Sequence, residues 1–233
     1  MNVHDILLFG AFPYVAVVML VVISLLRYRA NQFTISSLSS QFLEGRRLFW
    51  GSVPFHIGIS IVFFGHLTGF LIPRSVQLFG TVPARLLLME LTGLVGALLL
   101  LTGLILLVLR RVRDPRLRAV TGPTDLVVYA LLLFQAFTGL YVALFLRWGT
   151  AWYVQVAVPY LRSLFLLRPD IQRMAELPLM AQLHVLGAFT LFAVFSFTRL
   201  MHVLVAPLPY LWRSTQLVIW NRDRRAVRLE GRP

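Results

Sequence analysis

Two apolar stretches of this sequence each contain a pair of histidines. His56 and His66 lie ten residues apart in "FHIGISIVFFGH", residues 55–66, and His184 and His202 lie eighteen residues apart. An ionisable side chain at membrane depth is energetically unfavourable, so it usually has a partner and a task. A single histidine in an apolar helix is more often a hydrogen-bonded core residue than a ligand, but four histidines on two helices favour ligation.

Paired imidazoles on two helices are typical of a haem site. Two neutral imidazoles on opposite sides of a flat macrocycle give a six-coordinate b-type haem, which transfers electrons rather than binding oxygen. We therefore predict two b-type haems, whose irons take the four histidines as axial ligands. The fifth histidine, His4, lies near the N-terminus and is interpreted as a solvated residue.

The elements that must position these histidines are membrane-spanning helices. Of the 233 residues, 58% are hydrophobic and 13% are charged, whereas about a quarter of the residues of a soluble domain are charged. A helix of about 20 apolar residues crosses the hydrocarbon core, and five such runs are present: residues 6–26, 51–72, 86–109, 126–146 and 177–206. We expect an all-α fold in which one five-helix transmembrane bundle forms a single membrane domain, residues 1–233, with a tail over residues 207–233.

Composition excludes several other kinds of protein. The chain has no cysteine, which excludes disulfides, thiolate sites and iron–sulfur clusters ligated by this chain. The first apolar run lacks a basic segment before it and a cleavage site after it, so it is not a cleavable signal peptide. The net charge of +13 comes from arginine alone, since lysine is absent. Membrane topology and anionic lipid explain these arginines better than nucleic acid does.

The distribution of arginine predicts the orientation in a bacterial or archaeal cytoplasmic membrane. Cytoplasmic loops carry an excess of positive residues. Four arginines follow the first run, five follow the third and six lie in the tail, which makes fifteen on one side. We therefore expect an outer N-terminus, a cytoplasmic C-terminus and antiparallel second and fifth spans. The connection over residues 147–176 is predicted to contain a helix at the outer interface, with Trp148, Trp152, Tyr153 and Tyr160 as headgroup-level anchors, or alternatively a sixth span.

The rise of an α-helix predicts which histidines share an iron. His66 and His184 each lie about 10 Å below the outer surface at 1.5 Å per residue, so they face each other at an outer haem. His56 and His202 then hold an inner haem near the cytoplasm. If both helices are straight, the axial distance between His184 and His202 is about 12 Å longer than that between His56 and His66. Eighteen residues make five whole turns, which predicts that His184 and His202 share one helix face.

Polar residues near the two ends of the bundle are candidates for further roles. Haem propionates need cationic or hydrogen-bonding neighbours, and the cytoplasmic candidates are Arg27, Tyr28, Ser39, Arg110, Arg111 and Arg199. At the outer end, Glu90 could accept a proton from a quinol, or it could pair with Arg85. Glycines on the histidine-bearing spans, at positions 58, 65, 69 and 187, would allow either a macrocycle or another helix to approach the backbone.

Four segments carry a resemblance to a known family. They are "LRYRANQFT…SSQF" at residues 26–42, "FHIGISIVFFGHLTGFLIP" at 55–73, "LRRVRDPRLRAVTGPTD" at 109–125 and "LHVLGAFTLFAVFSFTRLMHVLVAPLPYL" at 183–211. With these segments and the histidine spacings of ten and eighteen, the sequence resembles the gamma subunit of respiratory membrane-bound nitrate reductase, a di-haem cytochrome b. The histidine pairing in that family agrees with the pairing inferred above.

The resemblance implies a function and several site residues. It implies that menaquinol or ubiquinol is oxidised beside the outer haem, and that electrons pass inward to an iron–sulfur beta subunit and a molybdenum alpha subunit that reduces nitrate. No nitrate chemistry then belongs to this chain. Gly65, His66 and Gly69 match positions around the quinol pocket of the family, and Tyr28, Ser39, Arg110 and Arg111 match positions near the inner haem. The family also uses a lysine at the start of the third span, where Arg85 is the nearest basic residue here.

Three other functions fit parts of the same pattern. A di-haem anchor of another reductase or of a hydrogenase would have the same haems and a different terminal acceptor. A proton- or metal-coupled transporter that uses histidines would be colourless. In a purely structural anchor, replacing His66 by alanine would leave quinol oxidation intact.

Overall fold

The computed structural model describes residues 2–30, 46–146 and 153–204. Contacts divide the chain into two compact units, Met1–His202 and Val203–Pro233, and the fold described here is that of the first unit. Ser39, Trp148, Trp152 and the predicted cytoplasmic tail lie outside the described residues.

All regular elements in the described residues are helical, which confirms the all-α prediction for them. Several of these helices begin with proline, whose fixed backbone angle and missing N–H suit the first position of a helix. In chain order the elements are α1 (Val3–Asp5), η1 (Ile6–Ala11), α2 (Phe12–Ala30), α3 (Arg46–Leu71), α4 (Pro73–Phe79), α5 (Pro83–Arg113), α6 (Pro115–Ala119), α7 (Pro123–Phe145), η4 (Tyr153–Ala157), α9 (Val158–Phe165), α10 (Ile171–Ala175), α11 (Leu179–Phe195) and η5 (Arg199–Val203).

Four helical segments in the described residues are long and apolar enough to cross a membrane. They are Val3–Ala30, Arg47–Leu71, Pro83–Arg113 and Pro123–Phe145, and they include the first four predicted runs almost completely. The fifth predicted run, residues 177–206, contains α11, an apolar helix of 17 residues. This length is at the lower end of what a spanning helix needs, about 17–25 residues.

The fifth run is not one continuous helix, so the prediction that His184 and His202 share a helix face is wrong. His184 lies in α11, which ends at Phe195, and His202 lies in the separate 3-10 helix η5. The chain turns between the two helices. The axial distance between the two histidines is therefore not the length of a straight eighteen-residue helix.

Side chains bind the backbone where α11 ends. Arg27 of α2 donates a hydrogen bond to the carbonyl of Ser196, and the hydroxyls of Ser24 and Ser196 lie 2.8 Å apart. The hydroxyl of Thr198 donates to the carbonyl of Phe195 over 2.8 Å. The Thr198 bond offers the backbone a local alternative to the helical ladder, and Arg27 and Ser24 of α2 hold Ser196 at the position where the α-helix ends.

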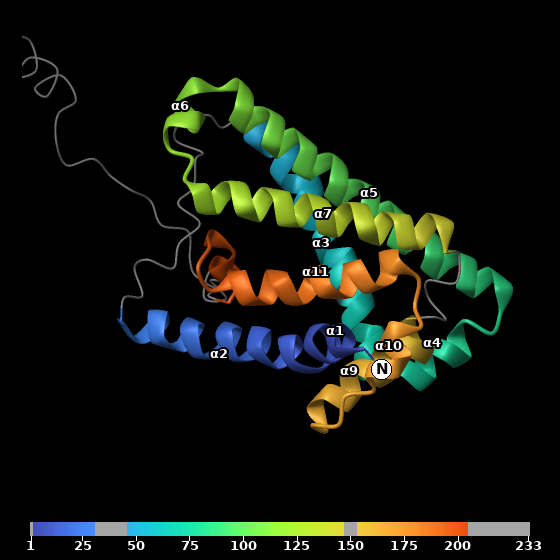
Figure 1. Ribbon diagram of the computed structural model, residues 1–233. Helices are drawn as coiled ribbons and strands as arrows, with labels where there is room; N and C mark the ends of the chain where they lie inside the picture. The colour runs from blue at the N-terminus through green and yellow to red at the C-terminus, as the bar shows by residue number, and fades with distance from the viewer. Residues whose placement is uncertain (1, 31–45, 147–152, 205–233) are drawn as a thin grey trace, which may run out of the picture. The chain divides into compact units, whose positions relative to one another are not determined.

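The long helices pack in the order α3, α5, α7, α11 and α2 (Figure 1). The contact between α3 and α5 is the closest, because glycines seven residues apart face the partner backbone on each helix. A Cβ atom at Gly58 would meet backbone atoms of Gly96 and Leu100, and one at Gly103 would meet backbone atoms of Gly51 and Phe55. Gly58 therefore serves helix packing, as small residues commonly do in membrane proteins.

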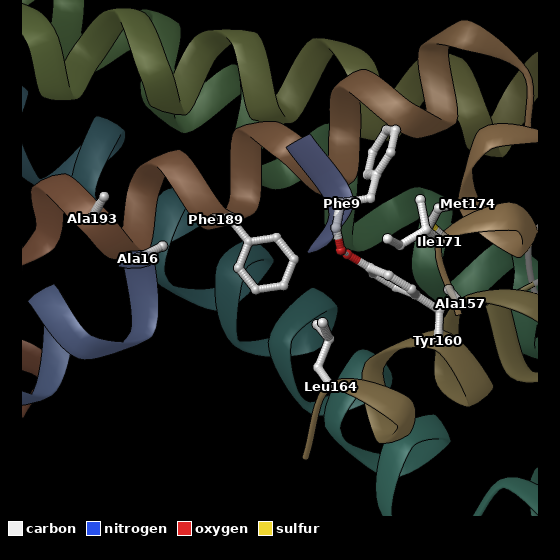
Figure 2. Close-up of a cluster of buried hydrophobic side chains, with 9 residues drawn as sticks. All are labelled: Phe9, Ala16, Ala157, Tyr160, Leu164, Ile171, Met174, Phe189 and Ala193. Carbon is white, nitrogen blue, oxygen red and sulfur yellow. Dashed lines mark hydrogen bonds between the residues drawn. The ribbon is translucent and has the colours of Figure 1, made fainter. Parts of the chain in front are cut away.

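A buried cluster joins the first helix, the 153–175 segment and α11 (Figure 2). Its buried members are Phe9, Ala16, Ala157, Tyr160, Leu164, Ile171, Met174, Phe189 and Ala193. The connection that was predicted to carry an interfacial helix thus folds into η4, α9 and α10 and contributes five of these nine residues. The segment is part of the core as well as a connection.

Tyr160 is inside the protein, so its predicted role as a headgroup-level anchor is wrong. The residue is fully buried, and its hydroxyl donates to the carbonyl of Phe9 over 2.7 Å. Phe9 lies in the π-helix η1, and Pro13 just beyond it has no N–H to donate. Tyr160 supplies a side-chain donor to this turn, and its burial raises the pKa of the phenol.

Candidate haem-ligating histidines

The imidazoles of His66 and His184 approach each other across the bundle. Their ring centroids are 6.4 Å apart and the ring planes are inclined by 40°. A ring nitrogen binds a metal at about 2 Å, so two imidazoles on opposite sides of one metal have centroids about 6 Å apart. The helices that carry them, α3 and α11, are not among the extensively packed pairs of described helices. The outer pair therefore fits a metal ion held between the two helices.

In three of the four histidines, Nδ1 lies within hydrogen-bond distance of a backbone carbonyl of the same helix. A carbonyl only accepts, so each Nδ1 carries the hydrogen and Nε2 keeps its lone pair for a metal. The bonds are His56 to Ser52 at 2.7 Å, His66 to Val62 at 2.8 Å and His202 to Arg199 at 2.6 Å. Within the described ranges, no three His, Asp, Glu or Cys residues gather as a metal-ion site, so the paired imidazoles are the candidate ligands.

His184 is held by residues of α7. Its Nδ1 lies 3.0 Å from the hydroxyl of Thr138, which donates its own hydrogen to the carbonyl of Phe134 over 2.9 Å. The hydroxyl therefore accepts from Nδ1, and Nε2 again keeps its lone pair. The amide of Gln135 donates to the His184 carbonyl over 3.1 Å and lies 3.4 Å from Nε2. A Cβ at Gly139 would lie 2.8 Å from the imidazole, so glycine makes room for the ring.

These α7 residues are not among the site residues predicted from the sequence. Gln135, Thr138 and Gly139 lie at positions i, i+3 and i+4, which share one helix face. A polar or small triplet of this kind in an otherwise apolar helix is the signal that could have found them.

Tyr153 covers the outer face of His66. Its hydroxyl donates to the His66 carbonyl over 2.8 Å, and the two rings meet edge to face with centroids 5.0 Å apart. A Cβ at Gly69 would lie 2.8 Å from the Tyr153 ring, whereas one at Gly65 would meet nothing within 4 Å. Gly69 is thus occupied by a protein side chain, and Gly65 faces open space. Burial raises the pKa of Tyr153 to about 12, so the phenol is a neutral donor at ordinary pH.

The two charged candidates at the outer end do not pair with each other. Arg85 is exposed and its guanidinium lies 5.4 Å from the centroid of the Phe79 ring. Glu90 is half-buried, and the ion pairs found in the described part of the chain do not include it. The pairing of Glu90 with Arg85 is therefore not present, and the carboxylate keeps its accepting capacity.

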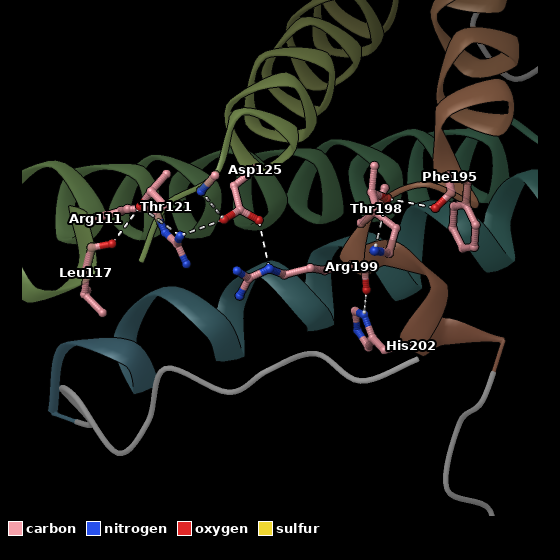
Figure 3. A network of polar contacts seen from close by, with 10 residues as sticks. Arg111, Leu117, Thr121, Asp125, Phe195, Thr198, Arg199 and His202 are labelled. Carbon is pink, nitrogen blue, oxygen red and sulfur yellow. Dashed lines mark hydrogen bonds and ion pairs between the residues drawn. The ribbon is translucent and has the colours of Figure 1, made fainter. Parts of the chain in front are cut away.

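At the inner end, two predicted propionate ligands share a carboxylate that the sequence analysis missed (Figure 3). Asp125, in the first turn of α7, lies 3.2 Å from Arg111 and 2.9 Å from Arg199. Arg110 is also buried, whereas Tyr28 is exposed. The signal for Asp125 was present in "TGPTD", because an acidic residue in the first turn of a helix is favourable. The pairing of His56 with His202 stays a prediction.

Comparison with known proteins assigns the family. The family model described as nitrate reductase gamma subunit matches residues 5–221. The nitrate reductase gamma chain of Bacillus subtilis is 34% identical over 212 residues, which cover 89% of this chain and 95% of that relative. The respiratory nitrate reductase 2 gamma chain of Escherichia coli is 34% identical over 225 residues, which cover 95% of this chain and 98% of that relative. The respiratory nitrate reductase 1 gamma chain of the same organism is 31% identical over 213 residues, which cover 90% of this chain and 95% of that relative. The chain therefore belongs to the nitrate reductase gamma subunit family.

Proposed function

We propose that this chain is the quinol-oxidising, di-haem cytochrome b subunit that anchors a nitrate reductase in the cytoplasmic membrane. When bound, two b-type haems would supply one-electron transfer between quinol at the outer surface and iron–sulfur and molybdenum subunits on the cytoplasmic side. The observation that carries the proposal is the outer pair, in which His66 and His184 from separate helices lie 6.4 Å apart.

The four histidines fit the proposed group through their hydrogen bonds. His66 and His184 would hold the outer haem, and His56 and His202 the inner one. In each imidazole Nδ1 has an oxygen acceptor, which fixes the ring and leaves Nε2 as the ligand atom. An oxygen acceptor behind a ligating histidine orients the ring and raises its basicity. In His56, His66 and His202, Nε2 makes no hydrogen bond within the described residues, whereas in His184 Nε2 lies 3.4 Å from the Gln135 amide, which would have to move aside for a haem iron.

The outer end has groups that suit quinol. A quinol that is oxidised loses two electrons and two protons, so it needs an adjacent proton acceptor as well as an electron acceptor. Glu90 is a half-buried carboxylate with free accepting capacity, Gly65 faces open space beside His66, and Arg85 is exposed nearby in sequence. With the N-terminus outside, the protons are released outside while the charges cross inward. Each charge that crosses is worth about 2.3 kcal/mol per 100 mV of membrane potential.

The inner end has the cationic residues that carboxylates of a bound group require. Arg111 and Arg199 converge on a single carboxylate, and the Nε of Arg111 is buried with no hydrogen-bond partner. These groups, with Arg110, Tyr28 and Ser39, are the proposed propionate contacts. The basic tail over residues 207–233 is proposed to bind the iron–sulfur partner, as a positive cytoplasmic segment beside the inner haem.

The test is a dithionite-reduced spectrum and a haem count on purified protein. We expect two b-type haems in the wild type, one in His66→Ala and one in His202→Ala, with reduction by quinol lost in His66→Ala. His4→Ala is the matched control, because it removes a histidine outside the two pairs, and it should retain both haems. A colourless wild type would favour the transporter, and His202→Ala with two haems would refute the inner assignment. Nitrate and other acceptors, offered to the purified complex, separate a nitrate reductase from another reductase.

A further inference from the structure

We propose that Asp125 is a positioning residue for the inner haem ligand His202, an inference that rests on the proposed function. Asp125 lies on α7 and His202 on η5, so the two residues come from different elements. The structure links them through one residue, Arg199, which binds the carboxylate with its side chain and the imidazole with its backbone.

The carboxylate of Asp125 is buried, and both of its oxygens accept hydrogen bonds. Only 7% of the residue is exposed. One oxygen accepts from the Nε of Arg199 over 2.9 Å. The other accepts from Arg111 over 3.2 Å and from the N–H of Gly122 over 3.2 Å. A buried charge needs both an opposite charge and hydrogen bonds to be tolerated, and this carboxylate has two guanidiniums and a backbone donor.

The second half of the link runs from Arg199 to the imidazole. The carbonyl of Arg199 lies 2.6 Å from Nδ1 of His202, so the same residue orients the ring and fixes its hydrogen on Nδ1. The five-residue η5 does not continue the ladder of α11, which ends at Phe195. A short 3-10 turn has weaker internal hydrogen bonds than an α-helix. Its attachment to α7 through Asp125 therefore determines where the ligand is held (Figure 3).

The charge balance gives the link a measurable signature. Arg111 and Arg199 both face Asp125, so replacing the carboxylate by a neutral amide makes the surroundings of His202 more positive. A more positive environment disfavours the oxidised iron relative to the reduced iron and raises its midpoint potential. The same substitution weakens the contact that holds the Arg199 side chain, so the imidazole of His202 is less firmly oriented. A purely structural ion pair elsewhere in the bundle would change neither quantity at one haem alone.

The experiment compares Asp125→Asn with Asp170→Asn in the purified full-length protein. Asp170 is a matched control, because it pairs with Arg173 over 2.8 Å in an exposed position of the 153–175 segment. Each variant is characterised by a haem count, an optical redox titration that resolves the two haems, and the low-spin signals of the ferric protein in electron paramagnetic resonance. Histidine variants identify the haems, since the inner signal is the one that His202→Ala removes.

We expect Asp125→Asn to raise the potential of the inner haem and shift its low-spin signal, while the outer haem and Asp170→Asn remain as in the wild type. Arg199→Lys keeps the charge but loses Nε, so it should shift the signal with a smaller change in potential. Asp125→Glu keeps the carboxylate, so its inner-haem potential and low-spin signal should lie closer to those of the wild type than those of Asp125→Asn. An unaltered inner haem in Asp125→Asn and Arg199→Lys, or equal shifts at both haems, would overturn the inference. A wild type without haem would instead refute the proposed function.

Discussion

Replacing Tyr160 by phenylalanine tests the unusual hydrogen bond of the first helix. The variant keeps the buried ring and removes the hydroxyl that donates to the Phe9 carbonyl over 2.7 Å. Pro13 cannot donate to that carbonyl, so residue 13 cannot replace the lost donor. Leaving a buried acceptor short of a donor destabilises a protein by about 1–3 kcal/mol. We expect a loss of this size in the free energy of unfolding, measured by SDS titration of the protein in detergent.

A double-mutant cycle isolates the cause. In a Pro13→Ala background, residue 13 regains an N–H that can donate to the Phe9 carbonyl, so the Tyr160→Phe change should destabilise the protein less. The difference between the two backgrounds measures the coupling, and contacting residues typically couple by about 0.5–3 kcal/mol. The loss of proline packing affects both arms of the cycle and cancels.

Tyr14→Phe is the matched control for Tyr160→Phe. Tyr14 donates to the Leu164 carbonyl over 3.0 Å, and this carbonyl also accepts from the N–H of Leu167 over 3.1 Å, so a loss of about 0.5–1.5 kcal/mol is expected. The reasoning is refuted if Tyr160→Phe destabilises the protein no more than Tyr14→Phe does. It is also refuted if the effect of Tyr160→Phe is the same with proline and with alanine at position 13.

Three further changes test the packing, the outer ligand and the pH response. Gly58→Ala places a Cβ against the α5 backbone and should lower the free energy of unfolding by about 1–3 kcal/mol. Gly93→Ala is the control, because its Cβ meets nothing within 4 Å, and it should leave the free energy of unfolding unchanged. Equal effects of the two variants would contradict the close packing of α3 and α5. Thr138→Val removes the acceptor behind Nδ1 of His184, the proposed outer ligand, and should weaken haem retention about 10–100-fold, measured as haem transfer to an apoprotein acceptor. Thr190→Val, which loses only a bond within α11, should match the wild type. The hydrogen bond from Arg173 lowers the pKa of Asp170 below the usual 3.8. The ion pair therefore stabilises the fold above pH 3.8, and this contribution is lost as the pH falls through the lowered pKa. Asp170→Asn should flatten the loss of stability at acid pH, and an unchanged slope in unfolding titrations would exclude this role.

The first four long helices and the proximity of His66 and His184 could be predicted from sequence because they depend on local patterns. Apolar runs of membrane length predicted the first four long helices within a few residues. The predicted depths of His66 and His184 follow from helical rise, and this arithmetic brought the two residues together without further information. Both inferences need only the composition and spacing of one segment at a time.

The contacts at the end of α11 could not be predicted in this way, because they involve distant residues. The residues after Phe195 read as an apolar helix, but Arg27 and Ser24, at the other end of the chain, bind Ser196. The burial of Tyr160 has a similar origin, since the carbonyl that accepts from its hydroxyl lies 151 positions earlier. The ion pairs of Asp125 likewise involve two arginines that are far apart in sequence.

The partners of the first helix have a consequence for how the protein is made. Phe9 and Ser24 bind Tyr160 and Ser196, which are separated from them by 151 and 172 positions along the chain. The ribosome therefore delivers the first helix to the bilayer long before its contacts exist, and the helix must wait in lipid without the Tyr160 hydroxyl. Long-range contacts of this kind form late. Biogenesis should accordingly depend on the complete chain, and release of a nascent chain that ends before α11 should leave the first helix accessible to proteases or insertion chaperones.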